Sequence, residues 1–355
     1  MDFLKCLPIV FVIGNEYEIL INTIKNGICA IEVNGIKFYE DNCGVYNSEK
    51  SFSKIRIPQK ALDKAKKYIV CYRESIDRKA YYSEFSTEYK CSFNFKPLAK
   101  KSNINIYHIA DVHYRFELAK KTANYFKDAL DLLIVNGDIG EVETEDNYFE
   151  VAKFVGDISQ GMIPVLFVRG NHDTRGRLAE KYPDYFPVNG KRTYFQFEIG
   201  PFCGVALDCG EDKLDSHEEY AGVCGFAAFR QNETFFLQNL ELPENKIPFA
   251  IAHICPFQTT FHKNDCFDIE RQTYALWNKE LSRLGIKFMI SAHMHKAYLL
   301  DSHHPNNILD HDFPVIVGSA CFDDDIWGTA ITIFEDKVVV RFTNSKNEIQ
   351  EEFIL

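Results

Sequence analysis

The sequence has no excess of basic residues, no long apolar run and no cysteines spaced as Cys-x-x-Cys. Its 40 Lys and Arg stand against 51 Asp and Glu, which gives a formal net charge of −11. A net negative chain has no overall attraction to a phosphate backbone or an anionic membrane, so a nucleic-acid role would need a local basic site. We therefore expect no nucleic-acid partner and no membrane partner.

Cysteine usage and the N-terminal residues bear on the cellular compartment. The 11 cysteines are an odd number, scattered from Cys6 to Cys321, which favours buried free thiols over a disulfide framework or a zinc ribbon. The longest apolar stretch near the N-terminus, Leu7 to Ile13, contains Pro8 and is too short to span a bilayer. No small-residue cleavage pattern follows it. We interpret this stretch as a strand and expect a cytoplasmic protein.

The first hundred residues have the pattern of a small all-β domain. From residue 8 to about 95, short segments rich in β-branched and aromatic residues recur between turn-like breaks, as in a β-sandwich of the immunoglobulin or fibronectin type. The polar stretch from Pro97 to Asn103 then marks a boundary, so we expect two domains, 1–100 and 101–355. The expected strands are Ile9–Ile13, Glu18–Thr23, Ile28–Val33, Ile36–Tyr39, Ser53–Ile57, Tyr68–Arg73 and Cys91–Phe95, with a helical turn at Ala61–Lys66.

The second region alternates apolar runs with helical periodicity. Strand-length runs at Ile104–Ala110, Leu132–Asn136 and Val165–Val168 are separated by expected helices at Glu117–Leu130 and Asn147–Ile158. This alternation is typical of βαβ units in a layered α/β domain. Later strands often follow one another directly, which favours a mixed sheet or a pair of sheets. These strands are Thr193–Glu198, Gly204–Asp208, Phe249–Ala252, Phe288–Ser291, Val315–Gly318, Thr329–Phe334 and Val338–Phe342.

Five polar clusters follow directly after expected strands, where the loops of α/β sheets usually hold ligands. Each cluster alone is weak evidence, because a lone buried histidine is more often a core residue and Gly-Asp after a strand is ordinarily a turn. Together, in one order, they offer the carboxylate, amide and imidazole groups of a metal site. The clusters are Asp111-Val-His113, Gly137-Asp138, Gly170-Asn171-His172-Asp173, His253 and His293-Met-His295.

In this order the five clusters resemble the motifs of the calcineurin-like metallophosphoesterase superfamily, from residue 104 to about residue 335. One departure is Ala292, where the last motif usually has a glycine. The resemblance implies a two-sheet α/β/β/α catalytic domain, preceded here by the small immunoglobulin-like domain. It is an enzyme fold in most relatives, although some members lack catalytic residues and serve as scaffolds.

The resemblance also implies a centre of two metal ions. Two cations about 3.5–4 Å apart can share a bridging water, lower its pKa so that hydroxide exists near neutrality, and clamp phosphoryl oxygens. Nitrogen and oxygen ligands without thiolate suit manganese, iron or zinc. The implied ligands are Asp111, His113 and His295 for the first ion, Asn171, His253 and His293 for the second, and Asp138 as a bridge between them.

Four further residues are candidate catalytic or substrate-binding groups. The resemblance implies that His172 protonates the leaving oxygen or stabilises phosphoryl charge, with Asp173 orienting or charging it; otherwise His172 only bonds its own loop. Arg175 can take a phosphate oxygen bidentately, or it is an ordinary surface arginine. The acidic loop Asp208–Tyr220 is a candidate rim of the substrate pocket, in which His217 contacts substrate or is merely exposed.

These expectations combine into a dinuclear-metal phosphoesterase that acts on a small or protein-borne phosphoester by attack of the metal-bridging hydroxide. Monoester and diester substrates are not separated by the sequence, and no pattern indicates an oligomeric state. The alternatives are a phosphodiesterase or nuclease and a scaffold that binds partners through the β-sandwich. A sandwich before such a domain also occurs in purple acid phosphatases, but Glu141 stands where they place a tyrosine ligand. We therefore expect no tyrosinate-to-iron colour.

Overall fold

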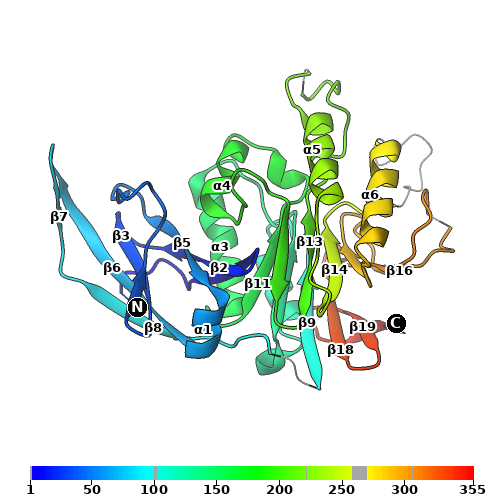
Figure 1. Ribbon diagram of the computed structural model, residues 1–355, viewed down its shortest axis with the longest axis horizontal. Coiled ribbons are helices and arrows are strands. Elements are labelled where there is room, and N and C mark those ends of the chain that lie inside the picture. The colour runs from blue at the N-terminus through cyan, green and yellow to red at the C-terminus, as the bar shows by residue number, and fades with distance from the viewer. Residues whose placement is uncertain (1, 100–101, 221, 258–269, 306) are drawn as a thin grey trace.

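The computed structural model describes residues 2–99, 102–220, 222–257, 270–305 and 307–355, and it has two large sheets packed face to face (Figure 1). Within these residues the larger sheet has nine strands, of which β9, β10, β11 and β1 run parallel. Across the sheet the strands are β20 (Ile349–Ile354), β19 (Val338–Thr343), β18 (Gly328–Phe334), β9 (Asn103–Ile109), β10 (Leu132–Asn136), β11 (Pro164–Val168), β1 (Ile9–Ile13), β2 (Glu16–Asn22) and β5 (Phe52–Pro58).

The second sheet has six strands in the described part of the chain. Its four inner strands run parallel, and the two edge strands, β12 and β16, pair antiparallel to them. Across the sheet the strands are β12 (Phe195–Ile199), β13 (Phe202–Leu207), β14 (Ile247–Ala252), β15 (Met289–Ser291), β17 (Val315–Val317) and β16 (Tyr298–Leu300). Parallel strands covered on both faces account for the near-continuous apolar runs in the sequence.

Helices cover the outer face of each sheet. Because strand side chains alternate between faces, Ile134 of β10 points into the core between the sheets, while Leu133 packs under helices. The outer face of the larger sheet is covered by α2 (Phe116–Ala123), α3 (Glu145–Ser159) and α4 (Tyr182–Tyr185), and that of the second sheet by α5 (Phe226–Gln238) and α6 (Arg271–Arg283). The predicted α/β/β/α layering is confirmed.

The N-terminal region is all-β, as expected, apart from the short helix α1 (Gln59–Ala65). What the sequence did not predict is that β1, β2 and β5 belong to the larger sheet, with Val10 beside Pro164 and Phe11 beside Val165. A strand as apolar as β1 needs cover on both faces, which the layered domain provides. The remaining strands form a third sheet: β4 (Ile36–Phe38), β3 (Gly27–Val33), β6 (Lys67–Arg78), β7 (Ser83–Phe85) and β8 (Tyr89–Asn94). The domain boundary at residue 100 stays a prediction, and the sheets do not follow it.

One expected helix is shorter than predicted. The periodicity indicated a helix over Glu117–Leu130, but α2 ends at Ala123, with Asn124 as its C-terminal cap. Lys127 has φ +48°, which breaks the α-helical path, and a short 3₁₀ helix follows at Lys127–Ala129. The expected helix is therefore divided into α2, a turn and this 3₁₀ helix.

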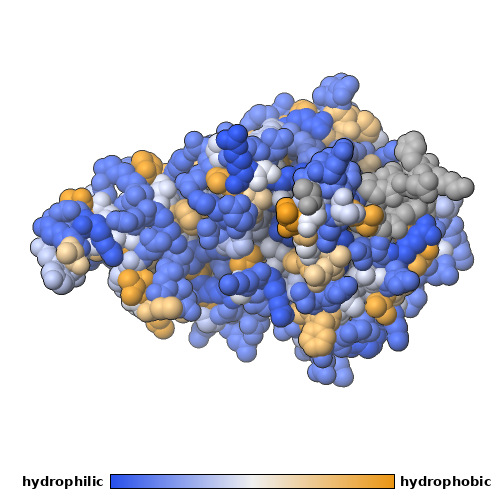
Figure 2. Space-filling model, turned by 90° about the horizontal axis from the view of Figure 1, so that it is seen from above, coloured by the Kyte–Doolittle hydropathy of each residue, from blue (hydrophilic) through white to orange (hydrophobic). Residues whose placement is uncertain are grey.

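The face of the molecule seen from above carries mainly hydrophilic side chains, with apolar residues scattered in small groups (Figure 2). No helix in the described ranges is long and apolar enough to cross a membrane.

Candidate metal centre

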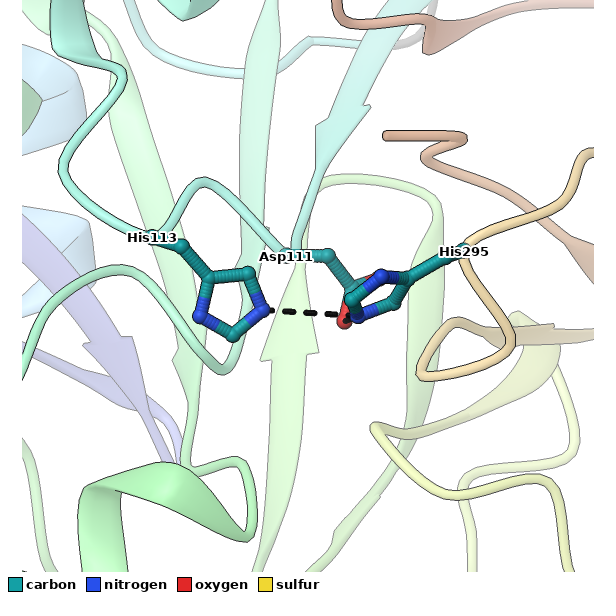
Figure 3. Close-up of side chains that lie close together, drawn as sticks. All are labelled: Asp111, His113 and His295. Carbon is teal, nitrogen blue, oxygen red and sulfur yellow. Dashed lines mark hydrogen bonds and ion pairs between the residues drawn. The ribbon is translucent and has the colours of Figure 1, made fainter. Parts of the chain in front are cut away.

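The first group of predicted ligands, Asp111, His113 and His295, comes together at the ends of β9 and β15. One potential ligand atom from each residue lies within 4.8 Å of the others. The Nε2 atom of His295 is 3.4 Å from Nε2 of His113 and 3.5 Å from Oδ1 of Asp111. Figure 3 shows the three side chains turned toward one another. This spacing is that of ligands around one cation, since ligands about 2.1 Å from a tetrahedral zinc lie roughly 3.4 Å apart.

The second group, Asp138, His253 and His293, also has ligand atoms within 4.8 Å of one another. Nε2 of His253 is 3.2 Å from Oδ2 of Asp138. The side-chain amide of Asn171 faces the same space, 2.9 Å from Nδ1 of His293 and 3.2 Å from Oδ2 of Asp138. Asn171 therefore lies beside the second group.

His253 lies at the border of the two groups. Besides Asp138, its Nε2 atom is 3.7 Å from Oδ1 of Asp111. Its Nδ1 atom must be the donor in the 2.6 Å hydrogen bond to the carbonyl oxygen of Asn136, because a carbonyl only accepts. That bond fixes the ring orientation and directs Nε2 into the site, as is usual for metal-binding histidines.

Backbone strain is concentrated in the predicted ligands. A non-glycine residue with positive φ is uncommon and costs on the order of 1–3 kcal/mol, and such residues cluster at functional sites. Five of the seven predicted ligands have this conformation: Asp111 (51°), His113 (44°), Asp138 (56°), His293 (74°) and His295 (51°). Ala292 is outside the left-handed region, so the missing glycine imposes no strain there.

Charges in the site are strongly coupled. Burial alone would raise the pKa of Asp111 and of Asp138, but the neighbouring His295 and His253 lower both below their usual range. Burial likewise opposes the charge on His253, yet Asp138 raises its pKa to about 10. Burial lowers the pKa of His293 to about 3. In the metal-free chain, the two buried carboxylates are thus paired with the imidazolium of His253, and the hydrogen bond with Asp111 also raises the pKa of His295.

The donor set fits bound cations. Oδ1 of the buried Asp111 accepts no hydrogen bond among the described residues. With its NH₂ group turned to the site, the amide of Asn171 faces two imidazole nitrogens and a carboxylate oxygen, and its oxygen accepts from Nη2 of Arg175 at 3.3 Å. In the opposite orientation the oxygen would face a bound cation. Nitrogen and oxygen donors without thiolate are the ligands that manganese, iron and zinc accept.

His172 lies at the mouth of the site. Its backbone N–H donates to Oδ1 of Asp138 at 2.8 Å, and its Nε2 atom is 4.0 Å from Oδ2 of that residue. The ring packs edge-on against His113, with 4.9 Å between ring centres. Burial lowers the pKa of His172, although the side chain keeps 38% of its exposure. A half-exposed imidazole beside the ligands can reach a bound substrate.

Asp173 has a different setting from the predicted one. Its Oδ2 atom accepts backbone hydrogen bonds from Gly170 at 2.8 Å and from Asp138 at 3.2 Å. Burial, followed by the charge of Asp138, raises the pKa of Asp173 to about 7. Its contacts thus hold the ligand loop, whereas the partners of His172 are Asp138 and Arg175.

Arg175 and His217 are the two predicted substrate-binding residues. The Nε and Nη2 atoms of Arg175 each donate to Glu211 at 2.6 Å, and Nη2 also reaches Asp212 at 3.1 Å. Nη1 lies 3.3 Å from Nε2 of His172, and Nη2 is also 3.3 Å from the side-chain amide of Asn171. His217 is half-buried in the loop after β13, and its ring lies against Tyr220 with 6.0 Å between ring centres. Neither ligand group includes it.

Sequence reasoning missed the roles of Glu211 and Asp212. They were included only in an acidic rim, yet Glu211 is fully buried against Arg175, and Oδ2 of Asp212 is 3.9 Å from Nε2 of His293. The sequence did contain a signal for both residues. Glu211 and Asp212 come soon after the expected strand Gly204–Asp208, just as the other motifs follow their own strands.

Comparisons with known proteins bear on the fold and the family of this chain. Over 98% of this chain, the structure is similar to a purple acid phosphatase, PPD1 from seeds of yellow lupin (Lupinus luteus), with a TM-score of 0.64, 11% identity and 73% of that chain covered. It is also similar to PhoD, with a TM-score of 0.56 and 10% identity over 98% of this chain and 88% of that one. No curated protein sequence matches it. The calcineurin-like phosphoesterase model matches residues 104–297, more than half of the chain. The chain therefore belongs to the calcineurin-like phosphoesterase family.

Proposed function

We propose that this protein is a dinuclear-metal phosphoesterase that hydrolyses a small or protein-borne phosphoester. The observation that supports this proposal best is that the two ligand groups are adjacent. Nε2 of His253 lies 3.2 Å from Oδ2 of Asp138 and 3.7 Å from Oδ1 of Asp111. Asp111, His113 and His295 would hold one ion. Asn171, His253 and His293 would hold the other, and Asp138 would contribute to both.

The protein's own residues supply the rest of the chemistry. When bound, divalent cations neutralise phosphoryl oxygens and lower the pKa of a water molecule toward neutrality. His172, half-exposed at the mouth, is placed to protonate the leaving oxygen or to stabilise phosphoryl charge. Arg175 has Nη1 directed toward His172, so a phosphoryl oxygen there would meet one of its N–H groups. Asp173 supports the reaction through the backbone of the ligand loop.

The donor set supports manganese, iron or zinc as the metals. The ten cysteines in the described residues are free thiols, which supports a reducing cytoplasmic location. The formal charge of −11 supports substrates smaller than nucleic acids.

A steady-state comparison of an aryl phosphate with a bis-aryl phosphate tests the proposal. Purified protein would be assayed with Mn²⁺, Zn²⁺ or Fe²⁺ and again with a chelator, beside metal analysis. We expect turnover of the monoester with about two metal ions per chain and loss of turnover on chelation. Faster turnover of the diester would assign a phosphodiesterase instead. No turnover of either ester with any of these metals would refute the enzyme assignment.

A further inference from the structure

The loop after β13 is fixed in place by a buried arginine. Arg230 of α5 has no exposed surface, and its Nη1 atom donates to the carbonyl oxygens of Cys209 at 2.9 Å and Glu211 at 3.2 Å. Its Nη2 atom pairs with Glu270 at 3.3 Å. A buried, doubly bonded guanidinium holds the loop backbone rigidly, because freeing it would leave a charge buried without partners. The backbone position of Glu211 is therefore set by the core of the second sheet.

From this fixed backbone position, Glu211 binds the guanidinium of Arg175 side-on through both of its carboxylate oxygens. Its two carboxylate oxygens take Nε and Nη2 at 2.6 Å each, and Oε1 also accepts the backbone N–H of Asp212 at 2.8 Å. A bidentate carboxylate–guanidinium pair fixes the plane and the direction of the guanidinium. With Asp212 also on Nη2, two of the three nitrogens of Arg175 are occupied by this loop.

The direction of the guanidinium determines what touches His172. The remaining nitrogen, Nη1, lies 3.3 Å from Nε2 of His172, while Oδ2 of Asp138 lies 4.0 Å from the same atom. The imidazole of a half-exposed residue would otherwise sample several rotamers. The contact with Arg175 restrains the ring over the metal ligands.

We propose that Glu211 is a positioning residue, which fixes the guanidinium of Arg175 and thereby holds His172 where the leaving group of a phosphoester departs. The inference rests on the proposed function and names a residue outside the family motifs in this sequence. Glu211 acts through Arg175 and touches neither ligand group in the described residues.

Glu211→Gln tests this role, because glutamine keeps the size of the side chain and removes its charge. The matched control is Glu218→Gln, an exposed glutamate of the same loop. Both would be assayed with Mn²⁺ on 4-nitrophenyl phosphate, whose leaving group needs little protonation, and on phenyl phosphate, whose leaving group needs more. We expect Glu211→Gln to lower kcat roughly tenfold or more on phenyl phosphate and less than about threefold on 4-nitrophenyl phosphate, with KM little changed. Glu218→Gln should match the wild type on both.

The same substitution in a His172→Ala variant shows whether Glu211 acts on kcat through His172. In His172→Ala, adding Glu211→Gln should cause no further selective loss on phenyl phosphate, because the residue that it positions is gone. Equal losses on both substrates, or additive losses in the double variant, would overturn the proposal. If Glu211→Gln fails to fold, Arg175→Lys replaces it, since lysine keeps the charge but not the planar fork, and the same selective loss is expected. A wild-type protein without any turnover would instead contradict the proposed function itself.

Discussion

The two groups of predicted ligands in the candidate metal centre differ in burial, although they share a border. In the second group, Asp138 is 1% exposed and His253 is 2% exposed. In the first group, Asp111 is equally buried, but the side chain of His295 keeps 47% of its exposure. One group thus lies inside the protein, and the other opens to solvent.

This difference indicates how each group is held. His253 is fixed from behind by its 2.6 Å hydrogen bond to Asn136, so its geometry is set before any ion binds. His295 packs against the ring of His113 and pairs with the carboxylate of Asp111, and both of these are themselves predicted ligands. We expect the buried group to keep its ion more tightly and the exposed group to exchange its ion more readily.

Asp138→Asn should have the largest effect, because Asp138 borders the second group and lies beside His172. Replacing it removes a buried negative charge, so metal content and kcat should fall by more than the roughly 10–100-fold typical of residues behind the ligands. Metal analysis and phosphatase assays measure both. Asp128→Asn, at an exposed carboxylate in the short 3₁₀ helix after α2, is the control and should change neither. Survival of metal content and activity in Asp138→Asn would exclude its assignment as a ligand.

Two histidine variants sharpen the comparison in metal-free protein. His253→Ala leaves Asp111 and Asp138 buried without their imidazolium, so the free energy of unfolding should drop by about 3 kcal/mol. His295→Ala removes a half-exposed ion pair and should cost less than about 1 kcal/mol. Urea denaturation in the presence of a chelator compares the two variants. Equal losses would mean that burial does not distinguish the groups.

The smallest effect is expected in the pH dependence of the ion pairs that His253 forms with Asp138 and Asp111. Burial opposes charge on His253, but Asp138 and Asp111 raise its pKa to about 10. A raised pKa means that the folded chain binds the proton more tightly, so this stability is complete below about pH 6.5 and is lost as the pH rises toward 10. The difference in unfolding free energy between wild type and His253→Ala should therefore narrow between about pH 6.5 and about pH 9.5 in metal-free protein. A constant difference would contradict charge pairing at His253.

Local signals predicted much of the fold and of the site. The apolar strand Ile9–Ile13 was identified from its composition, but its neighbour β11 was not, because pairing between distant segments leaves no local pattern. The family resemblance assigned His293 and His295 to different ions, and in the structure they lie in different ligand groups. The turn that divides them depends on backbone angles that a sequence pattern does not encode.

Side-chain partners were the least predictable part of the site. Asp173 was expected to orient His172, but its carboxylate binds the backbone of Gly170 and Asp138. The partner of His172 is instead Arg175, whose direction depends on Glu211 from a loop of the other sheet. Such contacts arise when two sheets pack face to face, and neither sheet's sequence contains them.

The place of β1 in the larger sheet affects synthesis of the chain. Ile9–Ile13 is translated well before its parallel neighbour, Pro164–Val168. At about 5–20 residues per second, this apolar strand waits on the order of ten seconds for that neighbour, exposed to aggregation or to a chaperone. The pairing of β1 with β11 therefore cannot form until residues 164–168 have been translated, and a nascent chain stalled before residue 164 would lack it.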